Sequence, residues 1–354
     1  MFPYILLASG LCFLTLFDKT KYQRTLFIFV SLIMILFSGL RVGGTGLGDY
    51  DAYLRLYSLV ETFDDVINPK IHAEIGFRLL SYFGNQLGFE GQFVIFSMAL
   101  IAFSLVAKVI YKKSPYPLFS LLLLLPFFFS FNMQTSRASV AAGFGLYFIF
   151  NFLKGNYKIA VLFFIIAISF HYSALVLLLV LLVKVPFLIL FFMSTFGAIF
   201  VKILDPFSIL IKIFNLIGLN RISDFILIYV NSSEYGYPMK IYDPRILLGL
   251  GVMFLIFRAR KKLARICDIR LFKVYVIGVM ILLCFSNNTA IALRTSYYFL
   301  LVSVVAIPIM AEAYNKSEYR ATGIKRTNSL GFILLYCLYS FALIGDFQPY
   351  KFGF

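Results

Sequence analysis

The sequence predicts an all-α polytopic membrane protein with about twelve transmembrane helices. Of the 354 residues, 61% are hydrophobic and only 14% are charged, and the mean hydropathy is +0.91. A soluble domain is about half apolar and about a quarter charged. Long apolar segments recur along the whole chain, and runs of about 18 or more apolar residues are typical of membrane-spanning helices. We therefore expect residues 1–354 to form a single integral membrane domain.

The apolar segments follow one another from the N-terminus to the C-terminus. The first has no basic residues before it and no clear cleavage site, so we interpret it as a span and not as a removed signal peptide. The segment 74–89 is amphipathic and fits an interfacial or re-entrant helix. The predicted spans are 2–17, 25–40, 92–110, 117–131, 138–153, 159–171, 172–183, 187–204, 243–257, 272–286, 297–312 and 329–345.

The charged residues predict how these spans are oriented. In or next to one alternating set of loops lie 20 of the 32 Lys and Arg residues but only 4 of the 16 Asp and Glu residues. Short loops rich in Lys and Arg stay in the cytoplasm. We therefore predict that both termini face outward, with outer loops at about 41–90 and 205–242 and cytoplasmic loops at about 258–271 and 313–328. The net charge of +16 is then a topology signal, and we expect no nucleic acid partner.

Charged and aromatic side chains gather in the predicted outer loops. Arginine is planar, permanently charged and forked, so it suits phosphate oxygens. A helix end avoids most of the roughly 2.5–3.5 kcal/mol that a charge costs at the bilayer centre. Tyrosines beside acids, amides and arginines can stack on sugars or hydrogen-bond to them. The phosphate candidates are Arg41, Gln134, Arg137 and Arg294, and the sugar candidates are Tyr53, Asp243, Arg245, Tyr297 and Tyr298.

Each of these residue types also has a plainer explanation. Gln134 and Arg137 are three residues apart and would share one helical face, but an arginine at a helix end can simply snorkel to the interface. Tyrosines at this depth are typical of aromatic belts. Asp49 and Asp51 match a DxD metal motif, although a solvated turn explains so short a match equally well. With only two histidines, a histidine-built metal site is not expected.

Glycines and cysteines give two further expectations. The glycine-rich turn at 43–48 would let the backbone adopt positive φ and approach a ligand closely. The four cysteines are scattered along the chain, so we expect no disulfide framework and no CxxC site.

Taken in order, these residues resemble the EpsG/Wzy family of O-antigen and exopolysaccharide polymerases. The stretches "QTSRASVA" and "SFHYSAL" carry much of the resemblance, which covers about residues 38–300. The long loop at 205–242 matches no family motif. The matching residues are Arg41, Gly48, Asp49, Tyr53, Glu74, Gln134, Arg137, Phe170, His171, Ser173, Ala174, Arg294 and Tyr297.

The resemblance implies a GT-C-like glycosyltransferase in the bacterial inner membrane, with its active site facing the periplasm. Such a protein moves a glycan from undecaprenyl pyrophosphate to a sugar hydroxyl of another lipid-linked repeat unit, and we expect inversion. His171, Asp49 and Glu74 are the candidates for the base that accepts the hydroxyl proton. The arginines can stabilise the diphosphate charge that builds in the transition state, so no metal and no other cofactor is expected.

The same resemblance implies the partners: an undecaprenyl-pyrophosphate-linked oligosaccharide, membrane lipid and a chain-length regulator. Three alternatives remain open at this point. The chain could be an O-antigen ligase or another lipid-linked glycosyltransferase, a transporter or flippase of lipid-linked glycans, or an outer-face acyltransferase that uses His171. Transporters place their sites near the membrane midplane and often contain repeats, whereas here the polar residues lie at one water edge and no repeat is visible.

Overall fold

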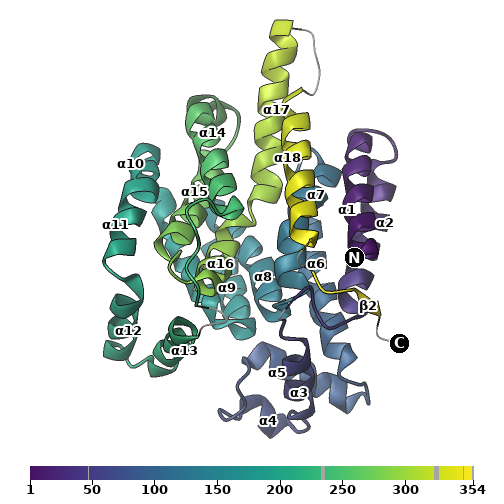
Figure 1. Ribbon diagram of the computed structural model, residues 1–354, viewed down its shortest axis with the longest axis vertical. Coiled ribbons are helices and arrows are strands. Elements are labelled where there is room, and N and C mark those ends of the chain that lie inside the picture. Colours follow the sequence, from purple (N-terminus) through teal and green to yellow (C-terminus); the bar gives the residue numbers. More distant parts are fainter. Residues whose placement is uncertain (47, 233–235, 323–326, 346, 353–354) are drawn as a thin grey trace. The chain divides into compact units, whose positions relative to one another are not determined.

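The computed structural model describes residues 1–46, 48–232, 236–322, 327–345 and 347–352, without the side chains at 202, 221, 225 and 315–329. This part of the chain is almost entirely helical (Figure 1). It divides into two compact units, Met1–Ala174 with Ser303–Phe354 (unit 1) and Leu175–Val302 (unit 2). The expectation of a single domain stays a prediction.

Unit 1 contains the two strands and most of the long helices. The strands β1 (Arg41–Val42) and β2 (Lys351–Phe352) pair antiparallel. Two short turns are η1 (Thr15–Phe17) and η2 (Phe128–Asn132). The helices are α1 (Phe2–Leu14), α2 (Gln23–Gly39), α3 (Tyr50–Ser58), α4 (Phe63–Ile67), α5 (Ile75–Gln86), α6 (Gln92–Lys113), α7 (Pro117–Phe127), α8 (Ser136–Leu153), α9 (Tyr157–Phe170), α17 (Ser303–Thr322) and α18 (Thr327–Ile344).

Unit 2 is helical throughout its described residues. The chain enters it through the helical segment η3 (Tyr172–Lys184), which begins at the end of unit 1. The other elements are α10 (Phe187–Phe192), η4 (Met193–Gly197), α11 (Ala198–Ile203), α12 (Pro206–Leu216), α13 (Asn220–Asn231), α14 (Pro244–Ile266), α15 (Ile269–Cys284) and α16 (Thr289–Leu300).

Helices occupy every range that was predicted as a span, but the number of spans stays a prediction. Among the described residues, one helix, α6, is long and apolar enough to cross a membrane, and counting two bent helix pairs as one span each raises the number to three. Other apolar helices have only 10–17 residues. The roughly 30 Å hydrocarbon core takes about 20 residues of straight helix.

Two of the predicted cytoplasmic loops are largely helix. At 258–271, α14 continues to Ile266 and α15 begins at Ile269. At 313–328, α17 continues to Thr322, and residues 323–326 lie outside the described part. Lys and Arg are good helix formers, so basic residues extend an apolar helix instead of ending it. In the predicted outer loop 205–242, α12 and α13 form, and residues 233–235 are not described.

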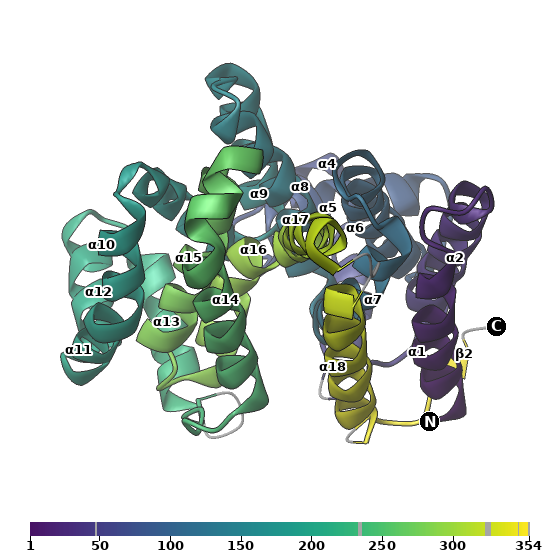
Figure 2. The same cartoon turned by 90° about the horizontal axis from the view of Figure 1, so that it is seen from above.

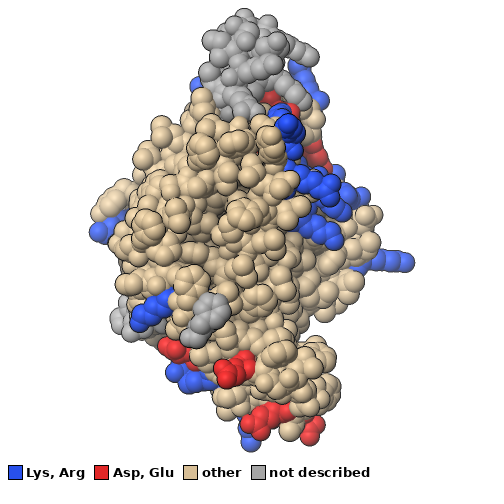
Figure 3. All heavy atoms as spheres, turned by 90° about the vertical axis from the view of Figure 1, so that its right-hand side faces the viewer, with Lys and Arg blue, Asp and Glu red and all other residues tan. Residues whose placement is uncertain are grey.

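The acidic segment predicted as the first outer loop forms three short helices, α3, α4 and α5. The sequence indicated only α5, the amphipathic one. Buried side chains from four helices, Tyr53 (α3), Phe77 (α5), Val94 (α6) and Val140 (α8), make one apolar cluster beneath them. On the face drawn in Figure 3, acidic side chains gather at the lower end, where Figure 1 places α3, α4 and α5, and a band of basic side chains lies well above them.

Three helices of unit 1, α1, α7 and α18, pack against one another, and Figure 2 shows them from above. Cys12 of α1 and Cys337 of α18 form a disulfide, while Cys267 and Cys284 are free. The scatter of the four cysteines had led us to expect no disulfide framework, and 325 residues separate these two along the chain. Folding nevertheless brings their Cα atoms to 6.3 Å.

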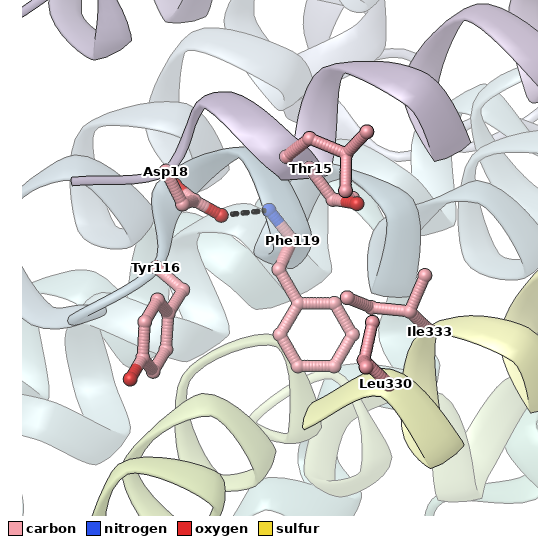
Figure 4. A pocket seen from close by; sticks show the side chains of 7 residues that line it. Thr15, Asp18, Tyr116, Phe119, Leu330 and Ile333 are labelled. Carbon is pink, nitrogen blue, oxygen red and sulfur yellow. Dashed lines mark hydrogen bonds between the residues drawn. The ribbon is translucent and has the colours of Figure 1, made fainter. Parts of the chain in front are cut away.

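A pocket of about 130 Å³ lies where η1, α7 and α18 meet (Figure 4). Its one charged lining residue, Asp18, is buried and accepts hydrogen bonds from the backbone N–H groups of Leu118 (3.0 Å) and Phe119 (2.8 Å). These N–H groups lie in the first turn of α7, where backbone N–H groups have no hydrogen-bond partner within the helix. Asp18 therefore caps α7, and this pocket contains none of the predicted site residues.

Candidate active site

Seven of the twelve predicted site residues lie in unit 1, and they converge on the turn between η2 and α8, which we call the QxxR turn (132–137). Because α8 begins at Ser136, Gln134 lies before the helix and Arg137 lies in its first turn. The expectation that the two side chains share a helical face was therefore wrong. The carbonyl of Asn132 accepts a hydrogen bond from Ser136 Oγ (3.0 Å), which closes the turn.

The glycine-rich segment at 43–48 packs directly on the QxxR turn. A Cβ atom at Gly44 would lie 2.9 Å from the carbonyl oxygen of Met133, and one at Gly48 would lie 3.4 Å from Gln134 Cα. Gly43 has φ +77°, a conformation that residues with a side chain rarely adopt. We expected these glycines to admit a ligand. At Gly44 and Gly48 the missing side chain instead allows close approach of the protein's own backbone at the QxxR turn.

Gln134 forms hydrogen bonds through both its backbone carbonyl and its side-chain amide. Its carbonyl accepts a hydrogen bond from the Asp49 N–H (3.2 Å). Its side-chain amide donates to Thr45 Oγ1 (2.6 Å), and the Thr45 hydroxyl donates to the carbonyl of Phe129 (3.0 Å). Gln134 thus fixes the glycine-rich segment, and its contact with phosphate stays a prediction.

Arg137 is held in a buried ion pair. Its Nη1 lies 2.5 Å from Glu74 Oε2, and the two side chains are only 17% and 8% exposed. The guanidinium carbon lies 5.4 Å from the ring centre of Tyr53 and 5.6 Å from that of Phe77. Within the described chain its Nε has no hydrogen-bond partner. Arg137 does not snorkel, because its guanidinium is held inside the protein by Glu74 and the two rings.

Glu74 lies where α5 begins and faces Arg137. The helix sits close to α9, since a Cβ at Gly76 would lie 2.8 Å from the carbonyl oxygen of Ser169. Oε1 of Glu74 accepts a hydrogen bond from the Tyr172 N–H (3.4 Å). Burial alone would raise the pKa of Glu74, but the neighbouring positive charge, chiefly that of Arg137, outweighs it and holds the pKa below its usual range. An ionised, paired carboxylate suits a counter-ion better than a base.

His171 lies at the junction of α9 and η3 and is half-buried. Its Nδ1 accepts a hydrogen bond from the Ser173 N–H (3.2 Å) and lies 2.6 Å from Ser173 Oγ. A backbone N–H can only donate, so Nδ1 must be the acceptor and the neutral ring carries its proton on Nε2. Neutral His171 therefore has a donor at Nε2, where a base needs a lone pair.

Asp49 and Tyr53 are one helical turn apart at the start of α3. The Tyr53 hydroxyl donates to Asp49 Oδ2 (3.2 Å) and accepts a hydrogen bond from the Arg137 N–H (3.4 Å). Burial, followed by the charge of Asp49, raises the pKa of Tyr53, so the hydroxyl stays protonated and donates. Asp49 is half-buried, whereas Asp51 is exposed. The sugar contact predicted for Tyr53 remains a prediction, since this side chain is fully buried.

Arg41, in β1, also contacts the QxxR turn. It is 1% exposed and donates from Nη2 to Ser136 Oγ (3.0 Å) and from Nε to the Gly43 carbonyl (3.1 Å). Its Nη1 donates to the carbonyl of Ser38. No described carboxylate lies within ion-pair distance of it. Burial lowers the pKa of Arg41 to about 10, so the guanidinium still carries its charge at neutral pH.

The other five predicted residues belong to unit 2 and have local partners there. Arg294 of α16 hydrogen-bonds to the Tyr229 hydroxyl. Asp243 caps α14 through the Arg245 N–H (2.9 Å) and pairs with the Arg245 side chain (2.6 Å). Two further residues of α16 are buried, Tyr297 and Tyr298. Their binding of phosphate or sugar stays a prediction.

The described residues offer no metal centre of the common kind. Among them, no group of three or more His, Cys, Asp or Glu side chains is placed to hold an ion. Asp49 and Asp51 do not act as a pair, because Asp49 receives the Tyr53 hydroxyl while Asp51 faces outward in the first turn of α3.

Three hydroxyl side chains that sequence reasoning did not assign a role connect the site. Thr45 links the glycine-rich segment to Gln134, Ser136 links Arg41 to the QxxR turn, and Ser173 sets the tautomer of His171. Their positions gave a weak signal, since each lies within six residues of a predicted site residue. Hydroxyls are common enough near helix ends that this spacing alone does not identify them.

Comparison with known proteins adds one result to this geometry. No curated protein and no solved structure matches the chain. The profile of the EpsG family matches residues 24–352, which include all twelve predicted site residues and nearly the whole chain. The chain therefore belongs to the EpsG family.

Proposed function

We propose that this chain is a polysaccharide polymerase of the bacterial inner membrane. It transfers a glycan from undecaprenyl pyrophosphate to a sugar hydroxyl of another lipid-linked repeat unit, at the periplasmic face. Membership of the EpsG family supports a polymerase-type membrane protein. The donor, the reaction and the orientation are our extension of that membership.

Two largely buried arginines at the QxxR turn, Arg41 and Arg137, carry the proposal. Arg41 and Arg137 are joined through Ser136 and its neighbouring backbone, and among the described carboxylates only Glu74 forms an ion pair with either, namely with Arg137. A buried charge is costly unless it is compensated. A diphosphate would offer Arg41 the anionic partner that no described carboxylate gives it, and guanidinium groups suit phosphate oxygens. This site therefore suits an anionic leaving group.

The residues at this turn can take the separate roles that glycan transfer requires. The bond between the donor sugar's anomeric carbon and the diphosphate breaks, and the electron pair leaves with undecaprenyl pyrophosphate. The arginines stabilise the negative charge that builds there. The acceptor oxygen forms the new bond to the same carbon and gives its proton to a base. Asp49 fits this role best, because Glu74 is committed to Arg137 and neutral His171 has a proton on Nε2.

His171 then acts as a donor and not as the base. Ser173 keeps Nδ1 engaged, so the proton of the neutral ring lies on Nε2, where it can be donated. Direct displacement by the acceptor inverts the anomeric centre. The roles of Asp243, Arg245, Arg294, Tyr297 and Tyr298 in binding diphosphate or sugar remain part of this proposal.

A gene-deletion strain complemented with variants tests the function. Loss of the gene should replace the ladder of polysaccharide lengths with a single-repeat band, and the wild-type chain should restore the ladder. Arg137→Lys keeps the charge but loses the fork, and it should leave the single-repeat band at normal membrane levels. Arg55→Lys, at an exposed site of α3, is the matched control. A deletion strain that still makes a full ladder would contradict the proposal.

Cysteine labelling tests the orientation. Asp64→Cys in the acidic outer segment and Lys112→Cys at the end of α6 are both exposed positions in unit 1. A membrane-impermeant maleimide should label the first in intact cells and the second only after the membrane is opened. Labelling of both in intact cells would refute the proposed orientation without deciding the reaction.

A further inference from the structure

The end of the chain returns to the segment that carries Arg41. Strand β2 pairs with β1, with Phe352 opposite Arg41 and Lys351 opposite Val42. In Figure 1 this last segment runs from the end of α18 to β2. The Gln348 N–H also donates to the carbonyl of Thr45 (3.1 Å). We call residues 347–352 the C-terminal strap.

The strap completes the end of α2. The last four carbonyls of a helix have no partner within it. In α2 each of these four carbonyls accepts a hydrogen bond from a group outside the helix. The carbonyl of Leu36 accepts from the Leu40 N–H, and that of Phe37 accepts from the Tyr350 hydroxyl (2.7 Å). The next two accept from side chains that come after the helix, Ser38 from Arg41 and Gly39 from Gln92.

Tyr350 is also packed as an aromatic anchor. Its ring centre lies 4.3 Å from that of Phe37 and 5.7 Å from that of Tyr4. Phe347, at the start of the strap, packs edge-on to Tyr4 (5.3 Å) and to Phe129 (5.2 Å). Aromatic pairs of this kind stabilise beyond the area they bury. The strap thus contacts α1, α2 and η2 at once.

We propose that Tyr350 is a positioning residue for Arg41, and that the strap holds the glycine-rich segment on the QxxR turn. Tyr350 completes the helix end from which Arg41 emerges, and Gln348 holds Thr45, whose hydroxyl receives the amide of Gln134. The match to the EpsG family runs to residue 352 and so includes the strap. The catalytic part of this inference rests on the proposed function. The structural part does not.

The structural part is tested by cysteine labelling. Thr45 is 1% exposed, so Thr45→Cys, in a chain with Cys267→Ser and Cys284→Ser, should react slowly with a water-soluble maleimide. Removal of residues 347–354 should raise the labelling rate at least about tenfold, because the strap no longer covers the segment. An unchanged labelling rate in the truncated chain would overturn the inference, whatever reaction the protein catalyses.

The catalytic part is tested by kinetics with purified lipid-linked repeat units. Tyr350→Phe removes only the hydrogen bond to Phe37 and should raise KM for the donor by up to about tenfold, with a smaller change in kcat. Tyr350→Ala should raise it further. Lys351→Ala, whose side chain is exposed, is the matched control and should leave KM unchanged. A loss of kcat at unchanged KM, or no loss at all, would contradict the positioning role.

Discussion

Nη1 of Arg137 lies 2.5 Å from Oε2 of Glu74, although 63 residues separate the two along the chain. This ion pair joins the first turn of α8 to the start of α5. The carboxylate fixes the guanidinium that we propose binds the donor's diphosphate.

Breaking the pair from one side should be strongly destabilising. Glu74→Ala leaves Arg137 buried without its carboxylate, and removal of one member of a buried pair costs about 3–5 kcal/mol. The double variant Glu74→Leu with Arg137→Met removes both charges and should recover most of that stability. Thermal unfolding in detergent measures both. A double variant that is no more stable than Glu74→Ala would contradict this assignment.

The same pair predicts a dependence of stability on pH. The pKa of Glu74 is lowered in the folded protein, so the pair contributes stability above the carboxyl's unfolded pKa near 4.3 and loses it as the pH falls through the folded value. The wild type should therefore lose thermal stability below about pH 4 more steeply than Glu74→Gln. Parallel curves for the two proteins would show that Glu74 has no shifted pKa.

His171 should tolerate one particular replacement. The amide nitrogen of glutamine can take the place of Nε2–H as a donor, whereas alanine offers none. We expect His171→Gln to keep transfer within about tenfold of the wild type and His171→Ala to lose about 10²-fold, as when an oxyanion donor is removed. Initial rates with lipid-linked repeat units compare them. Equal losses in both variants would favour His171 as the base.

Asp49 should be the residue whose loss follows the pattern of a general base. Asp49→Asn keeps the size and the contact with Tyr53 but cannot accept the acceptor's proton, so the rate should fall by about 10²–10⁴-fold. Asp51→Asn, two residues away and exposed, is the control and should be nearly silent. If Asp51→Asn were the inactive variant, the metal-motif interpretation of this pair would regain its force.

The sequence pointed to the residues of this candidate site because residue chemistry is local. The arginines, the acids and His171 were identifiable from their charge beside apolar segments. The positions of helices also followed from the apolar runs. How many of those helices cross a membrane could not be counted reliably, because several are shorter than a straight span.

Pairings across the chain could not be predicted in the same way. Nothing in the sequence shows that Glu74 faces Arg137, that Cys12 meets Cys337, or that Tyr350 returns to the end of α2. Each pairing depends on packing over tens to hundreds of residues. The glycine-rich segment is an example. The sequence predicted that another group lies close to its backbone, but it did not predict that this group is the QxxR turn.

The most direct measurement of the central claim is glycan transfer by the purified protein in vitro. Lipid-linked repeat units in detergent or liposomes are the only substrates, and polymer length is read on a gel. We predict polymer and free undecaprenyl pyrophosphate from the wild type and from Arg55→Lys, and at least about 10²-fold less from Arg137→Lys. Polymer formation by Arg137→Lys at the wild-type rate, or no polymer from any of the three, would contradict the account.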